Sequence, residues 1–143
     1  MEKVKGTGNF LKDLELGHIA EEYVSKYLQE YKGCAVVKNT RTDYSGLCEC
    51  DLIVTTAKGV TLKTEIKEDF LFELTGNVAV EEKCMKHSKA DAIMYKLGDE
   101  IYVVKRDRLL NLMVDYRTVY NVKGNILYLI PYVEFIKITK KIK

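Results

Sequence analysis

Residues 49–67, with the sequence ECDLIVTTAKGVTLKTEIK, decide the fold. Apolar and polar side chains alternate with a period of two on both sides of Ala57-Lys58-Gly59, which is typical of two strands that each bury one face. A three-residue loop with glycine in the left-handed position is a common hairpin connection. The sequence therefore predicts an antiparallel hairpin with strands over 49–56 and 60–67.

The loop length sets the register of this hairpin. With Leu52 opposite Thr64, Asp51 falls directly opposite Glu65, whereas a one-residue slip would exchange the two faces. Two like charges in that position destabilise a sheet unless positive charge lies between them, and a divalent cation is the obvious candidate. The same register places the apolar residues on the other, buried face: Cys50, Leu52, Val54, Leu62 and Ile66.

Lys67 lies two residues beyond Glu65 and hence on the same face of its strand. Carboxylate ligands at a strand end, with substrate phosphate filling the remaining positions, suit Mg²⁺ (or Mn²⁺ as a substitute) better than Zn²⁺. Such a metal supplies Lewis acidity and an activated water, while a lysine orients that water and stabilises charge on the phosphate. Glu-x-Lys triplets also arise by chance at this composition, so a purely structural hairpin stays open as the alternative.

An amphipathic helix is predicted over 14–31, with Asp13 as its N-cap and Gly33 just past its end. Glu21 falls on the margin of its buried stripe and can point towards the sheet, whereas His18 falls on the solvated face. Glu21 is thus the fourth candidate site residue. The stripe recurs at three- and four-residue spacing and comprises Leu16, Ala20, Tyr23, Val24, Tyr27, Leu28 and Tyr31.

The rest of the chain predicts further strands and one more helix, without a linker or a repeat. Strands are expected over 34–37, 77–81, 92–96, 101–104 and 126–130, with a loop or short helix over 83–89. Asp107 is expected to cap a helix that runs to about residue 116. We therefore expect a single α/β domain over residues 1–143.

Composition limits the possible partners of the chain. Its 143 residues are 47% hydrophobic and 31% charged with one proline, the balance of one folded domain. The formal net charge is +2, so any polyanion must meet a local basic patch. No apolar run approaches the roughly 20 residues of a spanning helix and no signal-type segment opens the chain, which predicts a cytoplasmic protein without a membrane partner. The four cysteines are then expected to be reduced.

The order Glu21, Asp51, Glu65, Lys67 resembles the PD-(D/E)xK nuclease superfamily. Residues 17–21, GHIAE, look like the helix signature of archaeal-type Holliday junction resolvases, and residues 65–81 look like phage-borne members. The resemblance implies a restriction-endonuclease-like core: a central mixed β-sheet with an antiparallel hairpin and flanking helices. It also implies that Asp51, Glu65 and Glu21 bind metal and that Lys67 serves the attacking water. Two departures are Cys50, where many members carry proline, and the short mixed segment 68–76, where a long helix is usual.

The size of the chain bears on its substrate. A chain without room for a separate sequence-reading domain must gain specificity from DNA shape, a partner or self-association. A homodimer suits symmetric incision of a four-way junction, and the tyrosine-bearing segments around 116–132 are predicted as its contact. We therefore expect a resolvase-type endonuclease acting on branched DNA. A general DNA endonuclease or exonuclease, or a non-catalytic nucleic-acid-binding protein on this fold, are the alternatives.

Several other residues could either take part in chemistry or serve only the structure. Cys48, Cys50, Cys84 and His87 have the composition of a zinc set, but Cys50 is expected on the apolar side of the hairpin, which favours core cysteines. Glu81 is a possible accessory acid of the metal site. Three sets of basic residues are possible phosphate contacts or simply solvated: Lys38 and Arg41, Lys105 with Arg106 and Arg108, and the lysines of the last seven residues.

Overall fold

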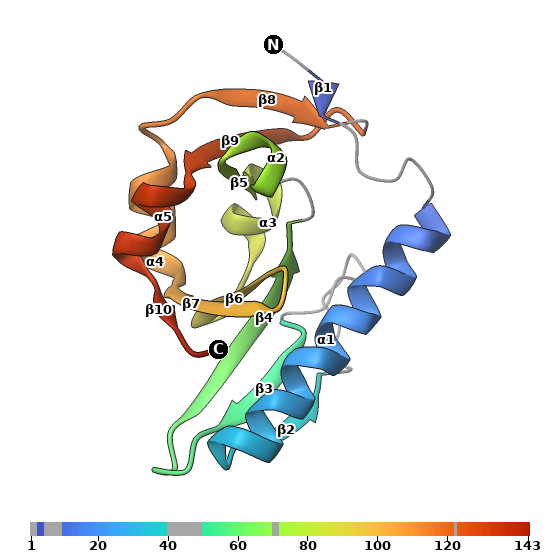
Figure 1. Cartoon of the computed structure of the whole chain (residues 1–143), viewed down its shortest axis with the longest axis vertical. Coiled ribbons are helices and arrows are strands. Elements are labelled where there is room, and N and C mark those ends of the chain that lie inside the picture. Colours follow the sequence, from blue (N-terminus) through green and yellow to red (C-terminus); the bar gives the residue numbers. More distant parts are fainter. Residues whose placement is uncertain (1–2, 5–9, 40–49, 70–71, 122) are drawn as a thin grey trace.

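The computed structural model describes residues 3–4, 10–39, 50–69, 72–121 and 123–143, and for 3–4 and 10–15 it describes the backbone alone. Within these ranges the chain forms a mixed α/β fold with two sheets and flanking helices (Figure 1). The predicted fold class, a central mixed sheet with an antiparallel hairpin, is confirmed.

The larger sheet has six strands in the order β10-β7-β6-β4-β3-β2. β4 and β6 pair in parallel and every other neighbouring pair is antiparallel, so the sheet is mixed. The strands are β2 (Ala35–Lys38), β3 (Leu52–Thr55), β4 (Thr61–Glu68), β6 (Ala92–Leu97), β7 (Glu100–Lys105) and β10 (Lys140–Lys141).

A second sheet has four strands in the order β1-β8-β9-β5. It lies at the end of the molecule away from the β3–β4 hairpin, which projects from the larger sheet (Figure 1). The strands are β1 (Lys3–Val4), β5 (Asn77–Glu81), β8 (Thr118–Asn121) and β9 (Ile126–Pro131).

The larger sheet separates the core into two clusters, one on each of its faces. On one face α1 (Phe10–Lys32) packs Ala20, Val24 and Leu28 against Leu52 and Ile66. The other cluster joins the two sheets with the short helices. These are α2 (Phe72–Thr75), α3 (Glu82–His87), α4 (Arg106–Met113) and α5 (Tyr132–Ile138). None of the described helices combines the length and apolarity that crossing a bilayer requires.

The predicted hairpin register is confirmed where β3 and β4 pair. Leu52 lies opposite Thr64 and Val54 opposite Leu62, as the three-residue loop requires. Gly59 closes this loop with a φ of +86°, in the left-handed region that favours glycine. Leu52, Val54 and Ile66 face α1 on the buried side, as predicted, and Leu62 is half-buried near the hairpin end.

Cys50 is buried, but the prediction that it shares a face with Leu52 and Val54 is wrong. It packs with the core cluster on the other face of the sheet. The regular pairing ends at Leu52, and the N–H of Asp51 donates to the carbonyl of Thr64 at 3.0 Å, one residue out of the register. A one-residue offset exchanges the faces of a strand, which accounts for the reversal at Cys50.

Gly33 lies directly after α1 with a φ of +64°, as predicted, but both predicted N-caps are wrong. α1 begins at Phe10, so Asp13 lies inside the helix, where the apolar and charged residues before it extend the helical run. α4 begins at Arg106, directly after β7, with Lys105 in the cap position and no side-chain cap, so Asp107 lies in the first turn. A capping residue marks a helix end only when its neighbours cannot continue the helix.

Segment 116–132 has a core role that the sequence did not reveal. It contains β8 and β9 of the second sheet, and Val119 and Ile130 are fully buried. Helix α5, which follows, was also not predicted, although Tyr132, Phe135 and Ile138 show helical spacing and Phe135 is fully buried. The buried part of this segment therefore cannot form the dimer contact proposed from the sequence.

Candidate active site

Asp51 lies at the point where β3 stops pairing with β4. One carboxylate oxygen, Oδ2, accepts a hydrogen bond from the N–H of Ile66 at 2.7 Å. The side chain thus takes the place of a strand partner for β4 and is fixed beside the chain between Glu65 and Lys67. Burial raises the pKa of Asp51, while the Ile66 N–H and the charge of Lys67 act in the opposite direction.

Glu65 and Lys67 share the face of β4 that points away from α1. Oε2 of Glu65 lies 3.9 Å from Nζ of Lys67, and the Glu65 side chain is 14% exposed. This oxygen is buried and accepts no hydrogen bond from the described part of the chain. Burial raises the pKa of Glu65, and the charge of Asp51 raises it further, although Lys67 partly offsets both. A buried carboxylate oxygen without a donor indicates a site that takes a partner from outside the chain.

Lys67 is held in its charged form. Burial alone would lower the pKa of Lys67, but the acidic groups around it, Cys84 and Glu65 foremost, outweigh burial and raise it above the usual lysine range. Cys84 lies on α3 and was not predicted as a neighbour of this lysine. Burial raises the pKa of the Cys84 thiol, and the charge of Lys67 acts in the opposite direction. No sequence signal linked these residues, because α3 meets β4 only through the tertiary fold.

Glu21 approaches from α1. Its side chain is 19% exposed, and Oε2 lies 3.7 Å from Nδ1 of the half-exposed His18, which was expected on the solvated face of the helix. Burial raises the pKa of Glu21, and the charge of Asp51 adds to this. These residues border a hollow of about 200 Å³ between α1 and the edge of the sheet, lined also by Lys38 and Leu52.

Asp51 is the common neighbour of the predicted site residues. Its charge raises the pKa of both Glu21 and Glu65, and Lys67 lowers that of Asp51. Among the described residues, no three His, Cys, Asp or Glu side chains gather closely enough to form a ready-made metal cage. Mg²⁺ is commonly bound through one or two carboxylates, with waters and substrate phosphate completing the octahedron. Asp51 and Oε2 of Glu65, which accepts no hydrogen bond from the described residues, fit that donor set.

The remaining candidates have mixed outcomes. Cys48 and Arg41 lie outside the described residues. Cys50 and Cys84 are free thiols, and within the described ranges they do not gather with the exposed His87 into a set of three metal ligands. Glu81 ends β5, half-buried, and its charge raises the pKa of Cys84, which places it near Lys67. Its accessory role stays a prediction.

Comparison with known proteins supports the fold. A scan against models of protein families and a search of curated proteins give no match. Among solved structures, the bacterial homing endonuclease I-Ssp6803I matches with a TM-score of 0.53 and 21% sequence identity, over 80% of this chain and 72% of that chain. At this identity the likeness shows a shared fold, in agreement with the mixed sheet and flanking helices described above.

Proposed function

We propose that the protein is a Mg²⁺-dependent DNA endonuclease that hydrolyses phosphodiester bonds. The observation that carries the proposal is the grouping of two desolvated carboxylates, Asp51 and Glu65, beside the charged Lys67, with one buried Glu65 oxygen that accepts no hydrogen bond from the described residues. Carboxylates that are buried together without enough hydrogen bonds are costly in a purely structural role. Perturbed acids of this kind concentrate at functional sites.

Asp51 and Glu65 would hold the metal, and Glu21 would complete the site from the side of α1. When bound, the ion supplies Lewis acidity toward a phosphate oxygen and lowers the pKa of a water. The Ile66 N–H orients the Asp51 carboxylate, so this ligand is positioned by the backbone of the strand that carries Glu65 and Lys67. The distances between Asp51, Glu65 and Lys67 therefore depend on where the pairing of β3 with β4 ends.

Lys67 acts in this proposal as a hydrogen-bond donor. Its raised pKa keeps the ammonium protonated at neutral pH, so it cannot accept a proton from the attacking water. An ammonium group near Glu65 can hold the water in line with the phosphorus and stabilise the charge that builds on the phosphate oxygens. Positioning and charge stabilisation are thus its contributions.

DNA as the substrate is supported by two observations. The sequence resembles the PD-(D/E)xK superfamily at Glu21, Asp51, Glu65 and Lys67, and the fold is shared with a homing endonuclease. A four-way junction is the finer proposal, supported by the resolvase-like residues 17–21. A homodimer that served it would use a surface other than the buried parts of β8 and β9.

The test is a cleavage assay. Labelled linear duplex, single-stranded DNA and a four-way junction are incubated with the protein and Mg²⁺, Mn²⁺ or a chelator. We expect metal-dependent cleavage that Glu65→Gln abolishes and that Glu30→Gln, the same change at an exposed position of α1, leaves intact. Cleavage of none of these DNAs would overturn the proposal in favour of a non-catalytic DNA-binding protein. Equal cutting of duplex and junction by a strict monomer would dismiss junction resolution alone.

A further inference from the structure

A second hollow, of about 620 Å³, lies where β6 begins and β7 ends. Its walls carry three basic side chains, Lys89, Lys105 and Arg106, and two acidic ones, Asp91 and Asp107. The set is called the basic groove below. It is separate from the hollow beside Glu21, with which it shares no lining residue.

The tertiary fold assembles the basic groove from segments far apart in the sequence. β6 and β7 are antiparallel, so Ala92 at the start of one pairs with Lys105 at the end of the other. The N–H of Arg106 donates to the carbonyl of Asp91 at 3.2 Å, which fixes the start of α4 beside the loop that carries Lys89. Three cations from two separate segments thereby line one hollow.

The acids of the basic groove are engaged with the chain. Oδ2 of Asp91 accepts a hydrogen bond from the N–H of Lys63 at 2.8 Å, and Oδ1 of Asp107 lies 3.6 Å from the Arg106 guanidinium, with the Asp107 side chain 90% exposed. Lys105 and Arg106 also stand at the N-terminal end of α4, where the helix dipole disfavours cations unless an anion is present. Three basic against two acidic side chains leave the groove a formal charge of +1, and an anion would offset the cations at the start of α4.

Arg106 connects the basic groove to the candidate active site. Its Nη2 donates to the carbonyl of Met85 at 3.0 Å, while its buried Nε donates to no atom of the described chain. Its charge also lowers the pKa of Glu65, so the guanidinium lies within electrostatic reach of the proposed metal ligand. Val103 lines the groove on the face of the sheet that carries α1, whereas Glu65 points to the other face, so Arg106 is the group that links the two.

We propose that the basic groove binds the phosphate backbone of the DNA substrate. This inference rests on the proposed function and adds to it the surface that holds the DNA. A net charge of only +2 leaves little attraction from the chain as a whole, so binding must depend on such a local cluster. Backbone contacts position DNA without reading its sequence.

The test measures DNA binding without cleavage. Fluorescence anisotropy with a short labelled duplex is recorded in chelator over a series of KCl concentrations. The Lys89→Ala/Lys105→Ala variant removes two exposed lysines and should bind about tenfold more weakly near 0.1 M salt. The slope of log K against log salt is negative, and each lost phosphate contact reduces its magnitude by about 0.9, so the magnitude should fall by about 1.8.

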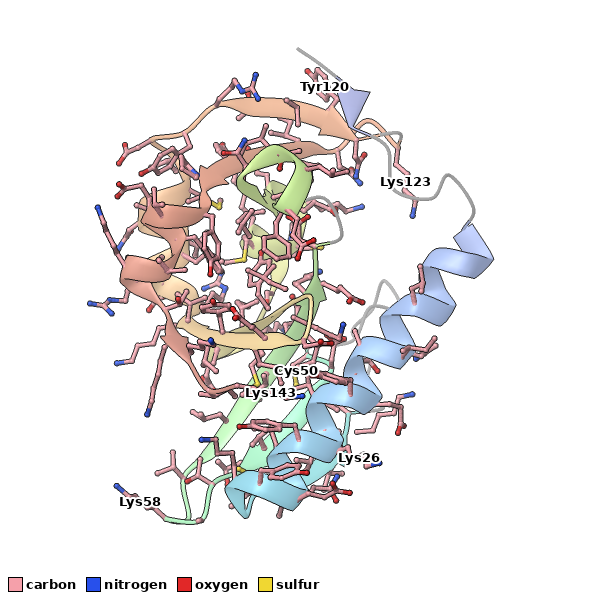
Figure 2. All side chains as sticks on the ribbon, viewed as in Figure 1. Lys26, Cys50, Lys58, Tyr120, Lys123 and Lys143 are labelled. Atoms are coloured by element: carbon pink, nitrogen blue, oxygen red, sulfur yellow. The ribbon has the colours of Figure 1, made fainter. Side chains whose placement is uncertain are left out.

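The matched control is Lys26→Ala/Lys58→Ala, which removes the same charge from exposed positions on α1 and at the hairpin tip (Figure 2). Neither lysine lines the basic groove. A groove variant that matches this control in affinity and slope would overturn the inference, as would binding by Lys105→Glu at the unmodified affinity. Circular dichroism melts confirm that each variant is folded.

The cleavage assay separates this inference from the proposed function. If the unmodified protein binds DNA through the groove but cuts none with Mg²⁺, the groove stands and the proposed function fails. If the protein cuts DNA and the groove variant binds as the control does, the proposed function stands and the groove inference fails.

Discussion

Neutralising Glu65 should stabilise the metal-free protein, by an amount that depends on pH. Glu65→Gln keeps the shape of a side chain that is 14% exposed and whose Oε2 accepts no hydrogen bond from the described residues. Burial raises the pKa of Glu65 in the folded chain, so over the interval between the unfolded and folded pKa values the folded state binds more protons. The free energy of unfolding of the unmodified protein therefore falls as the pH rises through that interval. Glutamine does not ionise and escapes this loss.

The size of the effect follows from the pKa shift. Each unit by which the pKa is raised corresponds to about 1.4 kcal/mol, and about 1 kcal/mol moves the Tm of a domain of this size by roughly 2–4 °C. In chelator, the Tm of the variant minus that of the unmodified protein should be smallest near pH 4 and grow by a few degrees towards pH 8. Differential scanning calorimetry measures both curves.

Adding Mg²⁺ should reverse the order of the two proteins at pH 8. A ligand at 100 times its Kd stabilises the folded state by about 2.7 kcal/mol, and only the unmodified protein keeps both carboxylates for the ion. A Tm difference that is independent of pH in chelator, or that shrinks as the pH rises, would refute the reasoning that Glu65 is a desolvated, ionised group awaiting a cation.

Further predictions concern the site and the hairpin. Lys67→Ala should lower the cleavage rate by about 10² to 10³, as for other lost charge-stabilising donors, and leave Mn²⁺ affinity intact by calorimetry; retained cleavage would contradict its role. Asp51→Asn should weaken Mg²⁺ and Mn²⁺ binding, and unchanged affinity both there and in Glu65→Gln would show that the ligands lie elsewhere. Gly59→Ala should cost about 1–2 kcal/mol, because its φ is +86° in open space. The same substitution at Gly17, inside α1 with nothing within 4 Å of the added Cβ, should stabilise the protein by up to about 1 kcal/mol. Thermal melts in which both substitutions change the Tm in the same direction would be inconsistent with these backbone conformations.

Much of the candidate site was predictable because it depends on local periodicity. Alternation with a period of two places Glu65 and Lys67 on one face of a strand, and the loop ending at Gly59 fixes the register as far as Leu52 opposite Thr64. The predicted position of Asp51 directly opposite Glu65 is wrong, because the Asp51 N–H bonds to the carbonyl of Thr64, one residue out of that register. Helical spacing likewise placed Glu21 at the margin of a buried stripe, and the structure finds it half-buried with its pKa raised by burial and by Asp51. These relations hold within a single helix or hairpin, where sequence spacing translates directly into geometry.

Only the tertiary structure decided what surrounds the site. The offset at Asp51 turned Cys50 to the other face, and α3 brought Cys84 beside Lys67. The crossover that joins the parallel strands β4 and β6 carries β5, which pairs in a second sheet that the sequence did not indicate. The basic groove is of the same kind, since Lys89 and Arg106 meet through the antiparallel pairing of β6 with β7. Contacts between distant segments are selected by the burial that the whole chain achieves, and no local pattern of residues encodes that choice.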